Sequence, residues 1–167
     1  TQSQKVAASG LELLGSGTFT LTNTGSANAI STLAANAGVV SFTQGTAYTV
    51  GTVNSVGITT TGNLALVGSA GMTIGANIST GAVDLRGTSR TTQLFSDVTI
   101  NTTNSDVTAG TINGGTGTAD GTYVFNVNNG TGNIVAGNTG LVIKLKSLAF
   151  TGTGNTNIGT VDATHGY

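Results

Sequence analysis

The chain has 167 residues, a net charge of −1, 27 glycines, and neither proline nor cysteine. Only 7% of its residues are charged, against roughly 25% in an average globular protein, and its five basic residues are scattered along the sequence. This composition excludes a disulfide framework, a thiolate metal site and the dense basic face of a nucleic-acid-binding protein.

Short runs of alternating apolar and polar residues predict β-strands along the whole chain. Glycine, asparagine, serine and aspartate, which favour turns, lie between these runs. The predicted strands are residues 19–22, 39–42, 48–53, 64–67, 72–75, 83–85, 97–100, 123–127, 141–146 and 148–150. One segment, 26–38, has an apolar spacing that suits a helix, through Ile30 and Leu33. No apolar run approaches the roughly 20 residues that span a bilayer, so we expect no membrane span.

The spacing of the predicted strands indicates how they are arranged. The early runs recur about every 20 residues, which is typical of a solenoid in which each strand pairs in parallel with its equivalent one coil later. We therefore predict an all-β fold over residues 1–167, a single β-solenoid domain of about eight coils. At the inter-strand spacing of roughly 4.8 Å, this gives a rod about 40 Å long. A β-sandwich, which also has many short strands, is the alternative.

The stretch SGTFTLTNTG illustrates the expected division between inside and outside. In a solenoid coil, Phe19 and Leu21 point into a narrow core, while Thr18, Thr20 and Thr22 face water. Threonine suits that outward position because its branched Cβ favours the strand and its hydroxyl stays solvated. The absence of proline agrees with strands that use all their backbone donors.

The segments GLELLGSGTFTLTNTGSANAISTLAANAG and TVGTVNSVGITTTGNLAL resemble the shaft repeats of filamentous-haemagglutinin-like exoproteins. These are large bacterial surface adhesins, often exported by two-partner secretion. The resemblance covers about residues 10–85 and is weaker beyond them. It implies a right-handed parallel β-helix, secretion to a bacterial cell surface, and attachment to surfaces. The family's secretion domain carries Asn-Pro motifs, which this chain lacks, so the resemblance is to the shaft.

Charged residues concentrate at one place, VDLRGTSR, which contains Asp84, Arg86 and Arg90. An acid and a base two residues apart share one face of a strand, as in polysaccharide lyases with a β-helix fold. Such enzymes need further acids on neighbouring coils, and stacking would bring Asp106 near Asp84. We interpret the three residues as a surface or saccharide contact rather than a catalytic group.

Two other motifs are weaker candidates for a metal site or a catalytic group. The segment INGGTGTADG approaches a calcium-binding nonapeptide, but Ala119 stands where the aspartate belongs and Asp120 comes one residue late. The single histidine, His165, has no second ligand near it in sequence. We therefore expect no catalytic residues, no bound metal and no cofactor.

The resulting prediction is a non-catalytic structural or adhesive segment of a bacterial surface protein, acting as a stiff spacer or attachment surface. Its partners would be surface glycans or proteins, or other chains of the same kind placed end to end. The alternative is a subunit that assembles into an extracellular fibre, because solenoid ends expose unpaired strand edges. An enzyme acting on polysaccharide is a further alternative, and it depends on Asp84, Arg86 and Arg90.

Overall fold

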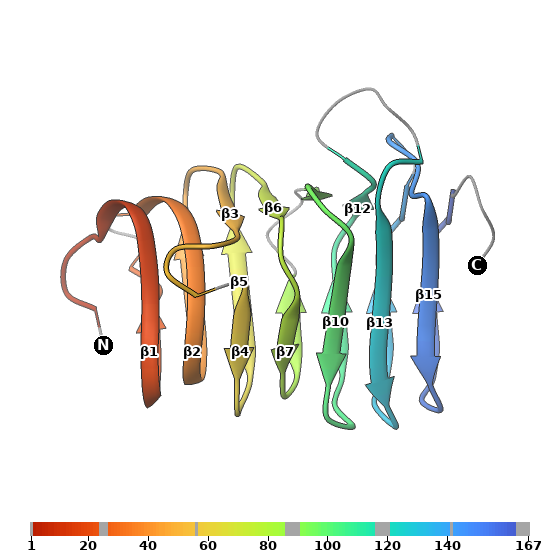
Figure 1. The fold of residues 1–167 in the computed structure, drawn as a ribbon, viewed down its shortest axis with the longest axis horizontal. Helices are drawn as coiled ribbons and strands as arrows, with labels where there is room; N and C mark the ends of the chain where they lie inside the picture. The colour runs from red at the N-terminus through yellow and green to blue at the C-terminus, as the bar shows by residue number, and fades with distance from the viewer. Residues whose placement is uncertain are drawn as a thin grey trace.

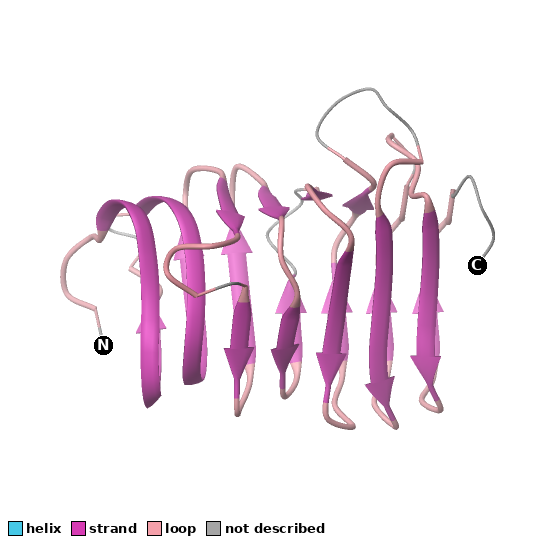
Figure 2. Ribbon diagram, viewed as in Figure 1, coloured by secondary structure: helices cyan, strands magenta, loops and turns pink. Residues whose placement is uncertain are grey.

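The computed structural model describes residues 2–23, 27–55, 57–85, 91–115, 121–140 and 142–162. Within these ranges the chain forms strands and turns and no helix (Figure 2). Every pair of neighbouring strands is parallel, and the strands stack as successive coils from one end of the molecule to the other (Figure 1). The all-β solenoid is therefore confirmed, and the β-sandwich alternative, which requires antiparallel sheets, is wrong.

Each coil contributes strands to three ladders that run along the molecule. The front ladder faces the viewer in Figure 1, the back ladder lies behind it, and the top ladder consists of short strands above. β1 (Ala7–Leu21) and β2 (Ala29–Gln44) are long enough to follow all three sides in turn. The front ladder continues through β4 (Ile58–Thr60), β7 (Ile78–Thr80), β10 (Val98–Thr102), β13 (Val124–Gly130) and β15 (Ser147–Gly152).

The other two ladders follow the same order of coils. The back ladder consists, after β2, of β5 (Leu64–Gly68), β8 (Val83–Leu85), β11 (Val107–Ala109), β14 (Ile134–Ala136) and β16 (Thr156–Ile158). The top ladder consists of β3 (Tyr48–Val50), β6 (Met72–Ile74), β9 (Thr92–Leu94) and β12 (Ile112–Asn113).

The strand register gives the length of each coil. Equivalent positions on the front ladder are 20 to 27 residues apart, from Leu13 at one end to Phe150 at the other. The described residues make about six turns, fewer than the eight predicted, because most coils are longer than 20 residues. At roughly 4.8 Å per coil, the stack is about 30 Å long.

A narrow column of branched side chains fills the interior. On the front ladder Ile58, Ile78 and Ile100 are register partners on successive coils, and each is at most 1% exposed. On the back ladder Leu64 and Val83 are stacked in the same way. Identical positions repeat from coil to coil, so β-branched and leucine side chains pack against their own equivalents.

The expected division between core and surface is correct for the first coil. Phe19 and Leu21 pack against the core, and Thr18 and Thr22 are exposed, whereas Thr20 is half-buried.

Threonine is not confined to the outside of the solenoid. Thr60, Thr80 and Thr102 face inward and are buried. The hydroxyls of Thr60 and Thr80 are 2.6 Å apart, and each also contacts the carbonyl oxygen of Gly62. Burial of a hydroxyl is tolerated because it is hydrogen-bonded, so threonine takes core positions near the turns.

Two predicted elements differ in the structure. Within the segment 26–38, residues from Ala29 onward belong to β2, because stacking on β1 outweighs the helical spacing of Ile30 and Leu33. Residues 142–146 form turns and a single bridge position rather than a strand, although Ile143 and Leu145 are buried as the alternation predicted.

Candidate functional site

Asp84, the one described member of the predicted surface contact, lies in β8 on the back ladder. Its neighbours in register are Ala65 and Thr108. It is half-buried and outward-facing, because the flanking Val83 and Leu85 are buried. Arg86 and Arg90 lie outside the described residues, so the acid–base pair remains a prediction.

Asp106, the acid expected near Asp84, and Asp97 both hold backbone groups of the following coil. The backbone N–H of Val83 donates to the carbonyl oxygen of Asp106, which places Asp106 on the neighbouring coil beside Ala82. The carboxylate of Asp106 accepts the backbone N–H of Asn133 at 2.7 Å, and that of Asp97 accepts Val124 N–H at 2.8 Å. Both carboxylates therefore fix a corner of the following coil.

Asparagine side chains perform the same task at other corners. The Oδ1 atom of Asn77 accepts the N–H of Thr99 at 2.8 Å, and that of Asn133 accepts the N–H of Asn155 at 3.1 Å. Each bond joins one coil to the next and satisfies a backbone donor that a turn would otherwise leave without a partner. This accounts physically for much of the asparagine at the corners.

Within the described ranges, no three histidine, cysteine, aspartate or glutamate side chains come together as ligands for a metal ion. His165, Ala119 and Asp120 lie outside these ranges. The phenol of the buried Tyr48 has no hydrogen-bond partner, and burial raises the pKa of this group. Tyr48 therefore stays protonated, and its ring packs edge-on against Phe42 with the centroids 5.2 Å apart.

An open groove with a volume of about 530 Å³ lies on the front ladder. Its lining includes a row of exposed polar side chains, one per coil: Ser79, Asn101, Asn128 and Thr151. Thr131 and Thr153, at the turns toward the back ladder, also line the groove. We call this hollow the front groove.

Two glycines, Gly130 and Gly152, are among the residues that line the front groove. Gly130 and Gly152 are opposite each other on β13 and β15 and are both exposed. Gly130 has a φ of 58°, which side-chain-bearing residues rarely adopt. An added Cβ there would meet the side chain of Asn104, and one on Gly152 would meet Asn129 and the carbonyl oxygen of Gly130. Both positions therefore require glycine.

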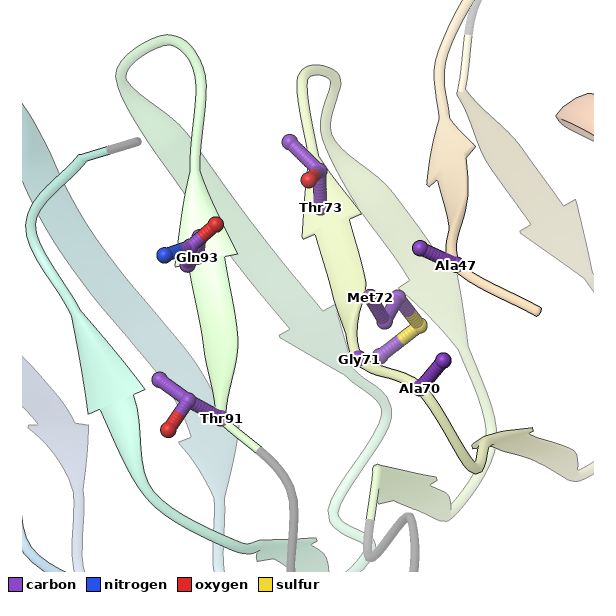
Figure 3. A pocket seen from close by; sticks show the side chains of 7 residues that line it. All are labelled: Ala47, Ala70, Gly71, Met72, Thr73, Thr91 and Gln93. Carbon is purple, nitrogen blue, oxygen red and sulfur yellow. The ribbon is translucent and has the colours of Figure 1, made fainter. Parts of the chain in front are cut away.

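A smaller pocket of about 230 Å³ lies on the top ladder (Figure 3). Figure 3 shows Met72, Gly71 and Ala70 close together on one side, with Thr91 and Gln93 on the neighbouring segment. Gly71, with a φ of 110°, interrupts the outward row between Ala47 and Thr91. The residues that line this pocket include no charged side chain.

A strap formed by residues 51–55 folds back from the third coil onto the first. The carboxylate of Glu12 accepts hydrogen bonds from Asn54 Nδ2 and from the backbone N–H of Ser55, both at 2.7 Å, and from the Ser55 hydroxyl. These bonds, led by the one from the Ser55 side chain, lower the pKa of Glu12. The strap therefore connects the first and third coils, which are not adjacent, through hydrogen bonds to Glu12.

Sequence reasoning missed the front groove because its residues belong to four separated segments. Ser79, Asn101 and Asn128 are each ordinary polar residues, and only the register brings them into one row. The available signal was the recurrence of a polar residue directly after a buried branched one: IS, IN and VN at 78–79, 100–101 and 127–128.

The sequence matches no protein-family model, and no curated protein or solved structure is significantly similar to it. No helix in the described part of the chain is long and apolar enough to cross a membrane.

Proposed function

We propose that the chain is a non-catalytic segment of a secreted bacterial surface protein, in which it acts as a stiff spacer and attachment surface. The observation that carries the proposal is the uninterrupted parallel stacking of every described coil on the next. A structure of this kind gains length with each coil without changing its cross-section. The resemblance of residues 10–85 to filamentous-haemagglutinin-like shafts supports the same proposal.

The interior chemistry also favours a structural role. The buried positions are mainly aliphatic, and the carboxylates of Asp97 and Asp106 are engaged by backbone donors. These two carboxylates have a structural task, because each fixes the backbone of the following coil.

Removal of one coil tests the spacer. Residues 58–77 begin at Ile58, and Ile78 is the equivalent position one coil later, so deleting them rejoins matching positions. We expect small-angle X-ray scattering to show a monomeric rod about 5 Å shorter than the parent at the same cross-section. A protein that shortens without keeping its cross-section, or a parent that scatters as a sphere, would contradict the proposal.

The second candidate function, a subunit of an extracellular fibre, is favoured by the edges of the end coils. Among the described residues, β1 pairs with β2 alone, β15 with β13 alone and β16 with β14 alone. Such edges accept a further strand, from more coils of a longer chain or from a second copy. Negative-stain electron microscopy separates the two: fibres that lengthen with protein concentration favour the subunit, and short rods at every concentration favour the spacer.

A further inference from the structure

We infer that the front groove is a binding site for a neutral, extended polysaccharide that runs along the solenoid axis. This inference deepens the proposed attachment function and depends on it for its biological meaning.

The first argument is the spacing of the polar row. Ser79, Asn101, Asn128 and Thr151 occur once per coil in continuous register, so they repeat at roughly 4.8 Å along the axis. The sugar units of an extended β-linked glucan repeat at a similar distance. A chain lying along the row therefore meets one polar side chain for each sugar unit.

The second argument is hydrogen-bonding chemistry. Asn128 Nδ2 donates to Asn101 Oδ1 at 2.8 Å, which fixes the orientation of both amides. Asn101 Nδ2 and Asn128 Oδ1 take no part in this bond. Amides and hydroxyls both donate and accept, and sugar hydroxyls need partners of this kind. The side chains are held by paired strands, so little ordering is required on binding.

The third argument is charge. No lysine, arginine, aspartate or glutamate is among the residues that line the front groove. An anionic polysaccharide would find no opposite charge there, and a neutral one loses no hydration of ions on binding. Gly130 and Gly152 add no side chain to the lining of the groove.

The test is isothermal titration calorimetry with neutral β-linked gluco-oligosaccharides, from disaccharide to hexasaccharide. The test variant is N101A/T151A, which removes one amide and one hydroxyl two coils apart in the row. The matched control, T108A/N157A, removes the same two groups two coils apart on the back ladder.

We expect the association constant to rise with oligosaccharide length until the ligand spans the four coils of the row. It should fall about tenfold or more in N101A/T151A and change less than twofold in the control, with little effect of added salt. Circular dichroism and the urea midpoint should match the parent for both variants.

Three results would overturn the inference: no binding of any neutral oligosaccharide, equal losses in the two variants, or stronger binding of polygalacturonate than of the neutral series. None of them would alter the scattering result of the coil deletion. Failure of the polysaccharide site is therefore distinguishable from failure of the spacer proposal.

Discussion

At the scale of single residues, alternation along short strands decides which side chains stabilise the fold. Ile78 is fully buried, and Ser79, the next residue on β7, is exposed. The two share one strand and one backbone environment. Any difference in what the two side chains contribute to the free energy of unfolding therefore comes from the side of the strand on which each one lies.

We predict that Ile78→Ala lowers the free energy of unfolding by about 2–5 kcal/mol, since it removes buried methyl groups and leaves a cavity between Ile58 and Ile100. The control Ser79→Ala should change it by less than about 0.5 kcal/mol. Urea denaturation followed by circular dichroism measures both. Similar losses in the two variants would mean that Ile78 does not pack as described.

Glu12 gives a second prediction at this scale. Its folded-state pKa is depressed by the hydrogen bonds from Ser55 and Asn54, so the carboxylate stabilises the fold above the unfolded pKa. That contribution is lost as the pH falls through the folded pKa. Glu12→Gln should therefore lower the urea midpoint at neutral pH, and the gap to the parent should narrow as the pH falls below the ordinary pKa of a glutamate side chain. The same gap at every pH would show that Glu12 acts only by packing.

At the scale of elements, close approach between coils depends on glycine at a few defined positions. A Cβ added to Gly38 in β2 would lie inside the contact distance of the carbonyl oxygens of Ser16 and Gly17 on β1. Gly17 itself, in the preceding coil, has no atom within 4 Å of its hypothetical Cβ.

We predict that Gly38→Ala destabilises the protein by about 1–3 kcal/mol, because backbone atoms must move apart to admit the methyl group. Gly17→Ala, the matched control, should be close to neutral. Thermal unfolding of the two variants provides the measurement. If Gly38→Ala were as stable as the control, the first two coils could not be stacked as closely as they are here.

At the scale of the whole molecule, the described strands pair with their equivalents on adjacent coils, and the strap on Glu12 adds a contact between the third coil and the first. Stability is then a sum of coil and interface terms, and opening begins at the ends. The central coils have two neighbours each, whereas the coil formed by β15 and β16 has one described neighbour.

We predict the slowest amide hydrogen exchange in β4, β7 and β10, and the fastest in β15 and β16. Mass spectrometry of peptic peptides after timed exchange measures this gradient. Uniform protection along the chain would indicate a single cooperative unit instead of stacked coils. In a fibre, protection of β15 and β16 should rise to the level of the centre, because their free edges would be paired.

The sequence by itself determined the class of fold. Its regular apolar alternation, its turn-forming corners and its lack of proline suit parallel coils, and these local preferences repeat along the chain. It also marked the strands that carry large apolar side chains, such as residues 64–67 and 72–75, which match β5 and β6 closely. β4 and β9 were not predicted, because each of these three-residue strands has a single large apolar side chain.

Only the tertiary structure decided the number of coils, the inward position of Thr80, and the meeting of Ser79, Asn101 and Asn128 in one groove. Turn length varies from coil to coil, so sequence distance does not fix register. A shift of one residue would turn every side chain of a strand to the opposite face. Stacking on the preceding coil removes this ambiguity, because only one register buries the branched side chains and completes the hydrogen bonds at the corners.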